Sequence, residues 1–502
     1  MLVALALVLA GCPSPSTTED SGPPPPPPPD ANDVHGDFVD RYLVNDGGLV
    51  LVPQQLEGRT ITAFVELPNK TFDNYPGVGF NNGTFYVPGV PEGARFTLQL
   101  GSIRINTDSR VVHLGSNSLG RPDTFQADRN EGLEVYAGNL APWGEDDEVQ
   151  VHSWNAGIGY YSTATQTPPF ALNAPDAGAT SLDASVLDLE GESVPEAARG
   201  DDLTLLQLSG TRSDGGLLVK VATRALSKPT TLVIGAPTPY AGDFVTLPLE
   251  DAGFTIRAGA FKQYSDEVGP GATPFLTRLL LDAHPGAFGR TTHTGGTPDL
   301  AVVELPPDAG DTTLSLQFGN PFSASWTPFV SAGALYDVQY TVPLADGGTS
   351  FARSELGFVS VALLKDAAQA APIAPLVSPP REVKLEGQDA KLPQTGVPLM
   401  PEVSWTAPSV GTVRRVEIEA VRLEATMVGL TRRVAVGTVR VLGKVTRVRL
   451  PQGFLNPQQT YYLRVTALSL PDTYDPTWPL LDVGPPAGAA SFSTAAFTTA
   501  AQ

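Results

Sequence analysis

The chain has 502 residues, and Gly (50) and Pro (48) make up about a fifth of it, a composition that favours turn-rich β structure over a helical or a disordered chain. The net charge of −21 excludes nucleic acid as a partner of the whole chain, because phosphate contacts require clustered Lys and Arg. A single cysteine excludes an intrachain disulfide and a multi-cysteine metal site. We therefore expect an all-β protein, with several β-sandwich domains in tandem behind a signal peptide and a Pro-rich tether.

Residues 1–11 are an apolar run, MLVALALVLAG, that ends at the only cysteine, Cys12. The run is too short for a membrane-spanning helix and is typical of a secretory signal. The tetrapeptide Leu9-Ala10-Gly11-Cys12 resembles the lipobox of bacterial lipoproteins. The resemblance implies that Leu9, Ala10 and Gly11 direct signal processing and that Cys12 carries a lipid inserted in a membrane. An ordinary cleaved signal peptide is the alternative.

Residues 12–36 are predicted to be a tether. Seven consecutive prolines, Pro23 to Pro29, favour a polyproline II rod of about 3.1 Å per residue. Such a rod would hold the folded part away from the membrane surface. In the lipoprotein family, Pro13 rather than Asp after the lipidated cysteine implies the outer membrane, so we expect a lipid-anchored protein of the cell envelope.

Residues 37–115 are predicted to form a small β-sandwich. Apolar residues alternate with polar ones from Ile61 and again from Phe96, which is typical of half-buried strands. The segment GTFYVPGVPEGARFTLQLG resembles the carboxypeptidase regulatory-like sandwiches. That resemblance implies an accessory domain without catalytic residues of its own.

Residues 116–375 are predicted to be β-rich, as one large sandwich or two small ones. Two Asp-x-Gly sequences, at Asp214 and Asp251, stand between strand-like runs and predict tight hairpin turns. Only Phe275–Asp282 and Ala362–Ala371 have the character of short helices.

A linker is predicted at residues 376–398, followed by a domain at 399–502. The segment LNPQQTYYLRVTAL resembles the fibronectin type III signature, with Leu455, Pro457 and Tyr461 at matching positions and Gln459 in place of Thr. The family implies a seven-stranded sandwich that serves as a binding or spacer module. Tyr461 would then bond through its hydroxyl to the chain upstream.

Local catalytic motifs are missing from the sequence: there is no His-Glu-x-x-His, no Gly-x-Ser-x-Gly and no phosphate loop. We therefore expect a binding or structural module of the envelope, not an enzyme, with no cofactor and no metal, and with a saccharide or a protein as its ligand. The alternative is an envelope hydrolase with an unrecognised site in residues 116–375, because catalytic groups can come from distant residues.

A first candidate binding surface comprises Trp143, His152, Trp154 and Tyr160. On a strand from Val149, the side chains of His152 and Trp154 would share the face opposite Val149. Flat aromatic rings beside polar groups would suit saccharide stacking. The alternative, which we favour, is that the aromatic residues fill a second hydrophobic layer.

A second candidate is a basic patch on the last domain. Alternation with valines predicts that Arg440, Arg447 and Arg449 point outward, where they could dock an acidic domain or an anionic envelope polymer. A solvated sheet face is the alternative and the default for exposed charges. Trp478 lies in a long loop that has the most ligand-like composition of this domain.

Overall fold

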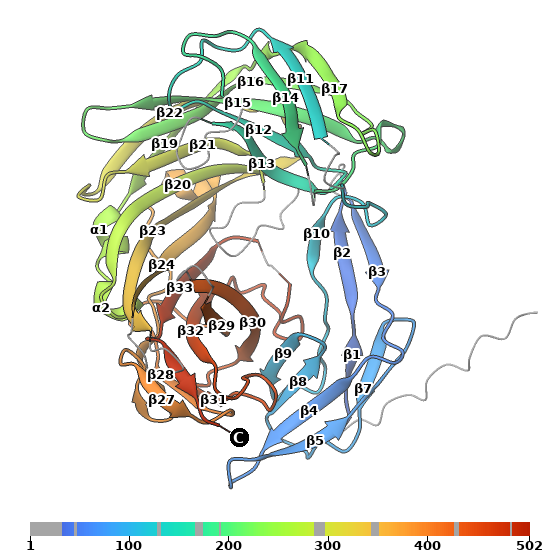
Figure 1. Ribbon diagram of the computed structural model, residues 1–502, viewed down its shortest axis with the longest axis vertical. Coiled ribbons are helices and arrows are strands. Elements are labelled where there is room, and N and C mark those ends of the chain that lie inside the picture. The colour runs from blue at the N-terminus through green and yellow to red at the C-terminus, as the bar shows by residue number, and fades with distance from the viewer. Residues whose placement is uncertain are drawn as a thin grey trace, which may run out of the picture.

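The structure is a computed structural model that describes residues 33–44, 48–127, 132–165, 174–189, 192–285, 297–342, 351–425, 431–481 and 484–501. Within these ranges the chain consists mainly of strands, so the predicted all-β class is confirmed (Figure 1). The described helices are short: α1 (Ala258–Lys262), α2 (Ser265–Val268), α3 (Lys365–Ala370) and a 3-10 turn (Ala197–Arg199). None of them has the length and apolar character needed to cross a membrane. Cys12, the signal segment and the proline run lie outside the described residues.

The N-terminal part forms small sheets that enclose one core. In chain order its strands are β1 (Val34–Asp37), β2 (Val39–Leu43), β3 (Leu49–Pro53), β4 (Ile61–Glu66), β5 (Phe72–Pro76), β6 (Val78–Gly79), β7 (Thr84–Val87), β8 (Phe96–Leu100), β9 (Ile103–Thr107) and β10 (Asn117–Leu119). The strand orders are β1-β7-β6, β10-β2-β3 and β5-β4-β8-β9. Alternate side chains of β4 and β8, such as Ala63 and Leu98, pack against Val34 and Phe85 of the β1–β7 pair.

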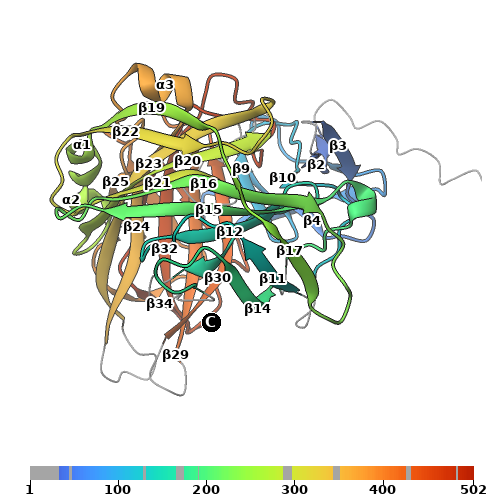
Figure 2. The same ribbon diagram turned by 90° about the horizontal axis from the view of Figure 1, so that it is seen from above.

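The middle part contains the longest strands. They are β11 (Gly132–Gly138), β12 (Glu148–Ser153), β13 (Ile158–Thr165), β14 (Leu182–Asp188), β15 (Asp202–Arg212), β16 (Leu218–Pro229), β17 (Thr238–Asp243), β18 (Val245–Thr246), β19 (Leu249–Ile256), β20 (Thr273–Pro285), β21 (Asp299–Leu305), β22 (Thr312–Gly319), β23 (Trp326–Val342) and β24 (Phe351–Leu364). The β19–β22 pair lies over the long strands, and α3 lies beside it (Figure 2). Phe254 and Phe318 from this pair enter the core formed by Leu279, Leu281 and Val303.

The C-terminal part is a two-layered sandwich. Its strands are β25 (Arg381–Leu385), β26 (Gln388–Asp389), β27 (Gln394–Val397), β28 (Glu402–Thr406), β29 (Arg415–Ala425), β30 (Thr431–Leu442), β31 (Arg447–Arg449), β32 (Thr460–Ser469), β33 (Ala487–Ser493) and β34 (Phe497–Thr499). The sheet β26-β25-β28-β31 faces β30-β29-β32-β33, with Val403 and Trp405 packed against Ile418 and Tyr461. The Tyr461 hydroxyl accepts a hydrogen bond from the backbone N–H of Asn456 at 3.0 Å, the local geometry predicted from the sequence.

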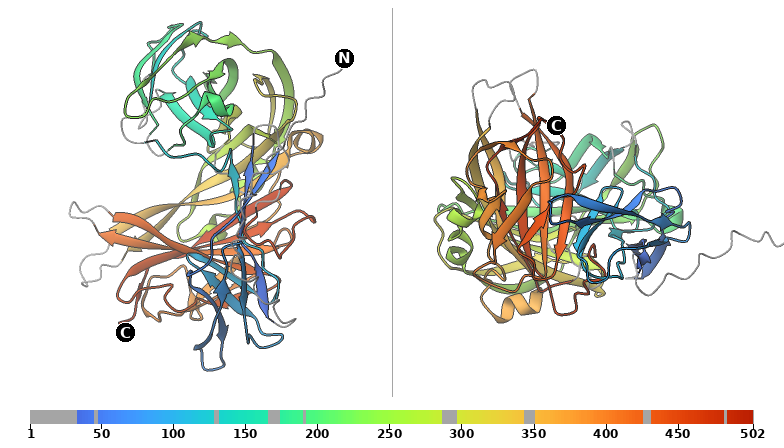
Figure 3. Two further views of the ribbon diagram at one scale, coloured as in Figure 1. Left: turned by 90° about the vertical axis from the view of Figure 1, so that its right-hand side faces the viewer. Right: turned by 90° about the horizontal axis from the view of Figure 1, so that it is seen from below.

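Strand pairing continues from one part of the chain into the next. Strand β24 pairs antiparallel with β33, with Val359 opposite Ala490, and β30 pairs parallel with β9, with Thr438 opposite Ile103. One hydrogen-bonded path therefore runs from β13 through the middle strands and the C-terminal sandwich to β5. Figure 3 shows the C-terminal strands beside the N-terminal ones in its right-hand view. The middle, C-terminal and N-terminal parts thus share one continuous sheet.

At the end that contains β12 the sheet is strongly curved, so that β12 contacts β21 across the two strands between them. Val149 and Val151 face a core shared with β11, β14 and β17, whereas Gln150 faces the opposite side. The Gln150 amide donates to Asp299 Oδ2 of β21 at 2.9 Å, and the Asp299 N–H donates to Gln150 Oε1 at 3.1 Å. Strands three places apart in a flat sheet would be separated by roughly 14 Å. Contact between β12 and β21 across β15 and β16 therefore requires a curl close to that of a barrel.

The hairpin predicted around Asp214 is confirmed, whereas the one predicted around Asp251 is wrong. Strands β15 and β16 pair antiparallel up to Arg212 and Leu218, which flank the Asp214 turn. Asp251 instead lies inside β19, opposite Gln317 of β22. An Asp-x-Gly sequence permits a tight turn but does not require one, and pairing with β22 keeps this segment extended.

One of the two predicted helices is also wrong. Residues Phe275–Asp282 lie in β20, where Leu279 and Leu281 enter one core and Leu280 enters another. A strand buried on both faces has a continuous apolar run, which periodicity cannot distinguish from a short helix. The other predicted helix contains α3 (Lys365–Ala370).

Candidate functional site

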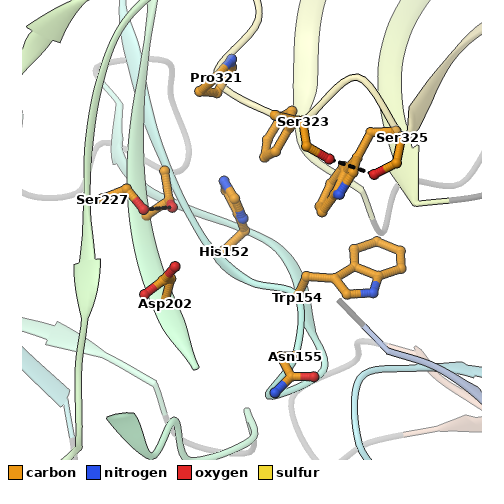
Figure 4. A pocket seen from close by; sticks show the side chains of 11 residues that line it. His152, Trp154, Asn155, Asp202, Ser227, Pro321, Ser323 and Ser325 are labelled. Carbon is orange, nitrogen blue, oxygen red and sulfur yellow. Dashed lines mark hydrogen bonds between the residues drawn. The ribbon is translucent and has the colours of Figure 1, made fainter. Parts of the chain in front are cut away.

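A pocket of about 570 Å³ lies at the mouth of the curled sheet (Figure 4). The end of β12 and the turn after it supply His152, Trp154 and Asn155. The neighbouring ends of β15 and β16 supply polar side chains, and residues 321–326, between β22 and the start of β23, form the opposite wall. The volume falls within the range of small-molecule pockets, and barrel mouths are a common place for them.

Aromatic side chains form one wall of the pocket. The rings of Phe322 and Trp326 stack in parallel with centroids 4.3 Å apart, and Trp154 meets Trp326 edge to face at 4.9 Å. The indole N–H of Trp154 donates to the carbonyl of Leu43 at 2.9 Å, which fixes this ring at the junction with β2. Phe322 is partly exposed, whereas both tryptophans are buried. The two packed tryptophans therefore form a fixed wall, and the ring of Phe322 in front of them is accessible from the pocket.

His152 lies at the back of the pocket and carries no charge. It is 4% exposed, and burial lowers the pKa of its imidazole to about 3. Neither ring nitrogen has a hydrogen-bond partner among the described residues. The ring of Phe322 packs against the imidazole with centroids 4.9 Å apart. An unpaired buried polar group costs about 1–3 kcal/mol, so His152 would gain from a ligand that donates or accepts a hydrogen bond.

Polar groups surround His152 at the pocket rim. The Thr204 hydroxyl donates to Ser227 Oγ at 2.7 Å, and the Ser323 and Ser325 hydroxyls lie 2.5 Å apart. Figure 4 shows the imidazole of His152 between Ser227 on one side and the Ser323–Ser325 pair on the other. Exposed Asp202 is the only acidic residue of the described lining, which contains no Lys or Arg.

Asn155 is held at the rim by a buried ion pair. Its amide donates to Asp201 Oδ1 at 2.8 Å, and Arg121 donates to the other oxygen of this carboxylate at 2.9 Å. Asp201 is completely buried, so its charge depends on Arg121 for compensation. The pair fixes the turn after β12 and therefore the position of Asn155.

Two carboxyl groups lie deeper in the curled sheet. Asp282 and Asp299 are directly opposite each other on β20 and β21, and both are buried. Burial, together with the charge of Asp299, raises the pKa of Asp282, and burial also raises the pKa of Asp299. The pKa of each carboxyl group is also affected by a side-chain hydrogen bond to the other, and such a bond between two carboxyl groups requires a proton on one of them.

This carboxyl pair is connected to the pocket through β12 but does not line the pocket. Gln150 bonds to Asp299 and precedes His152 by two residues on the same face of β12. Further inside, Lys220 donates to Glu148 at 2.9 Å. No three His, Cys, Asp or Glu side chains gather closely enough to hold a metal ion in the described ranges.

The residues of the first predicted surface have different positions. His152 and Trp154 line the pocket together, whereas Trp143 is buried in the core of Val149 and Val151. The prediction for Trp143 is corrected, because its buried side chain packs in this separate core and does not line the pocket. Tyr160 belongs to β13, and its side chain lies outside the described part of the structure. Sequence reasoning missed Phe322 and Trp326, which no local motif connects to His152.

The predicted outward basic patch is wrong for Arg449. Its side chain is 3% exposed and contacts Glu66 at 2.8 Å, Glu386 at 2.9 Å and Glu402 at 3.4 Å. Arg440 is partly buried and pairs with Glu417 at 3.1 Å. Arg447 alone points outward, with 71% of its side chain exposed. The alternation pattern correctly predicted that these side chains point away from the sandwich core. It did not predict that the N-terminal sheet covers part of the face on which they lie.

Trp478 is engaged within the molecule. Its ring lies between the guanidinium of Arg41, 4.2 Å from the ring centroid, and the imidazole of His113, whose centroid is 4.5 Å away. The backbone N–H of His113 donates a hydrogen bond to the carbonyl of Thr477 in the same loop at 2.7 Å. The loop that the sequence presented as ligand-like therefore joins the C-terminal sandwich to the N-terminal strands.

Comparison with models of known protein families and with curated proteins finds no match for this chain.

Proposed function

We propose that this chain is a lipid-anchored binding protein of the cell envelope, placed in the outer membrane, that takes a small ligand into the pocket behind Phe322. The observation that carries the proposal is the unpaired imidazole of His152 in a pocket of about 570 Å³ with both aromatic and hydroxyl-bearing walls. Ligand pockets typically combine apolar walls with a few convergent polar groups. The aspartate pair is enclosed behind this pocket, so the lining itself supports binding.

The C-terminal sandwich supports a role in spacing and support. Its two facing sheets and the bond from Asn456 to Tyr461 favour the proposal that it is fibronectin type III-like. The likeness of residues 49–115 to carboxypeptidase regulatory-like sandwiches stays a prediction. Both parts would then hold the middle part and its pocket at a fixed position.

A fragment-binding experiment tests the pocket. Ligand-observed NMR with a library of neutral and charged fragments would be recorded on the full chain and on Ser325→Trp, which places an indole at the pocket rim. Ser102→Trp, on the exposed turn between β8 and β9, is the matched control. We expect fragments to bind the unaltered chain and Ser102→Trp but not Ser325→Trp. Equal binding to all three proteins, or no binding to any, would refute the pocket.

Membrane fractionation tests the anchor independently. Cys12→Ser removes the thioether-forming sulfur, and we expect the chain to leave the membrane fraction, whereas Ser14→Ala should remain with the outer membrane. Stable anchoring requires more than one acyl chain, which a lipoprotein-type modification supplies. Retention of Cys12→Ser in the membrane fraction would contradict the lipid anchor.

A further inference from the structure

We infer that the ligand of this pocket is a neutral saccharide, held with one apolar face against Phe322 and with a hydroxyl hydrogen-bonded to His152. The inference rests on the proposed binding function and specifies the chemical class of its ligand. Four features of the described lining support it: its charge, its aromatic wall, its hydroxyl groups and the unpaired imidazole.

The charge of the lining disfavours anionic ligands. Among the described lining residues, Asp202 is the only Asp, Glu, Lys or Arg, and the whole chain carries a net charge of −21. A phosphate or a carboxylate is normally bound by Arg, Lys or a group of backbone N–H donors. The described lining contains neither basic residue, and His152 remains neutral because it is buried. A phosphorylated or acidic sugar would therefore meet repulsion from Asp202 without a compensating cation.

The aromatic wall disfavours a cationic ligand. Recognition of an organic cation by aromatic residues typically uses a cage of several open ring faces, because the face of an aromatic ring is its negative part. One face of Trp326 is covered by Phe322, and the edge-to-face contact between Trp154 and Trp326 occupies a second face in the cluster. Of these three rings only Phe322 is partly exposed, so the described lining forms no cage for a cation, whereas one ring is enough for apolar contact with the C–H face of a sugar ring.

The polar groups match the alcohols of a sugar. A hydroxyl both donates and accepts, and so do Thr204, Ser227, Ser323 and Ser325. A neutral imidazole offers one N–H donor and one nitrogen acceptor, and both lack a partner in the described structure. A hydroxyl of the ligand would satisfy one of these nitrogens and remove part of the cost of its burial. An apolar ligand would leave both nitrogens unpaired.

Tryptophan fluorescence would test the ligand class, because two of the five tryptophans, Trp154 and Trp326, line the pocket. The full chain, in a detergent without a sugar headgroup, would be titrated with cellobiose, maltose, lactose and N-acetylglucosamine. Glucose 6-phosphate, galacturonate and tetramethylammonium are the charged comparison probes. We expect a saturable change with at least one neutral sugar and none with the charged probes.

Two variants assign the response to the pocket. His152→Phe keeps a flat ring and removes both nitrogens, so we expect the affinity for the neutral sugar to fall about tenfold, the value of one good hydrogen bond. The thermal midpoint of this variant should be unchanged or higher, because no unpaired nitrogen remains, which separates lost binding from lost folding. Trp143→Phe, in a separate core, should bind the sugar as the unaltered chain does.

The outcomes distinguish the ligand class from the binding function. Binding of a charged probe alone, or fragment binding without any response to the neutral sugars, would overturn the saccharide class and leave the binding function in place. Sugar binding that is equal in His152→Phe would overturn the assigned contact. If neither the sugars nor any member of the fragment library binds, the proposed binding function itself is refuted.

Discussion

Arg449 joins the N-terminal sheet to the C-terminal sandwich through one buried guanidinium. It contacts Glu66 of the N-terminal strand β4, Glu386 beside β25 and Glu402 of β28, and it also donates to the carbonyl of Met400 at 2.8 Å. Replacing it by Ala leaves three carboxylates close together without their shared cation. We therefore expect Arg449→Ala to destabilise the contact between the N-terminal sheet and the C-terminal sandwich.

The size of the loss follows from burial. Removing one partner from a buried ion pair costs about 3–5 kcal/mol, whereas an exposed pair contributes about 0–1 kcal/mol. The side chains of Glu66, Glu386 and Glu402 are 38%, 23% and 28% exposed, so water can hydrate them once Arg449 is gone. We therefore expect a loss near the lower limit, about 3 kcal/mol.

Arg447 provides the matched control, because it lies two residues away on the same strand and contacts the same Glu402 at 3.4 Å from an exposed position. Urea unfolding followed by circular dichroism should show a loss of at most about 0.5 kcal/mol for Arg447→Ala. The double variant Arg449→Ala/Glu66→Gln should recover part of the loss, because it removes one of the three crowded negative charges. Equal losses in Arg449→Ala and Arg447→Ala would refute the assignment of Arg449 as a buried link.

Two further changes test the polar interior and the C-terminal sandwich. The raised pKa values of Asp282 and Asp299 mean that the folded chain binds more protons than the unfolded chain above about pH 4, so this pair reduces stability as the pH rises. Asp282→Asn donates to Asp299 without needing a proton, and its urea midpoint should therefore fall less than that of the unaltered chain between pH 5 and pH 8; an equal or larger fall would contradict a proton on this pair. Tyr461→Phe leaves the N–H of Asn456 without its acceptor, and we expect a loss of about 1 kcal/mol in the free energy of unfolding; an unchanged midpoint would show that this bond contributes nothing.

The sequence by itself determined the features that depend on neighbouring residues. Period-two alternation identified the strand class, and it placed Val149 and Val151 on the core side of β12 with Gln150 on the other. The hairpin at Asp214 and the hydrogen bond of Tyr461 also follow from short segments, because turn conformation and corner geometry are set within a few residues.

Tertiary structure decided everything that depends on which strands become neighbours. Alternation indicates which side chains lie on the same face of a strand, but it does not indicate what covers that face. Arg449 was therefore expected to be exposed to solvent, whereas in the structure it lies under the N-terminal sheet. Phe322 meets His152 from 170 residues further along the chain, and Asp299 meets Gln150, only because the sheet curls. Asp299 meets Asp282 because the adjacent strands β20 and β21 pair in that register. Pairing between distant strands is selected by the burial of whole faces, and a single sequence contains no local signal for that choice. The glycine and proline content therefore indicated a turn-rich β-protein, and the curl of the sheet created the pocket.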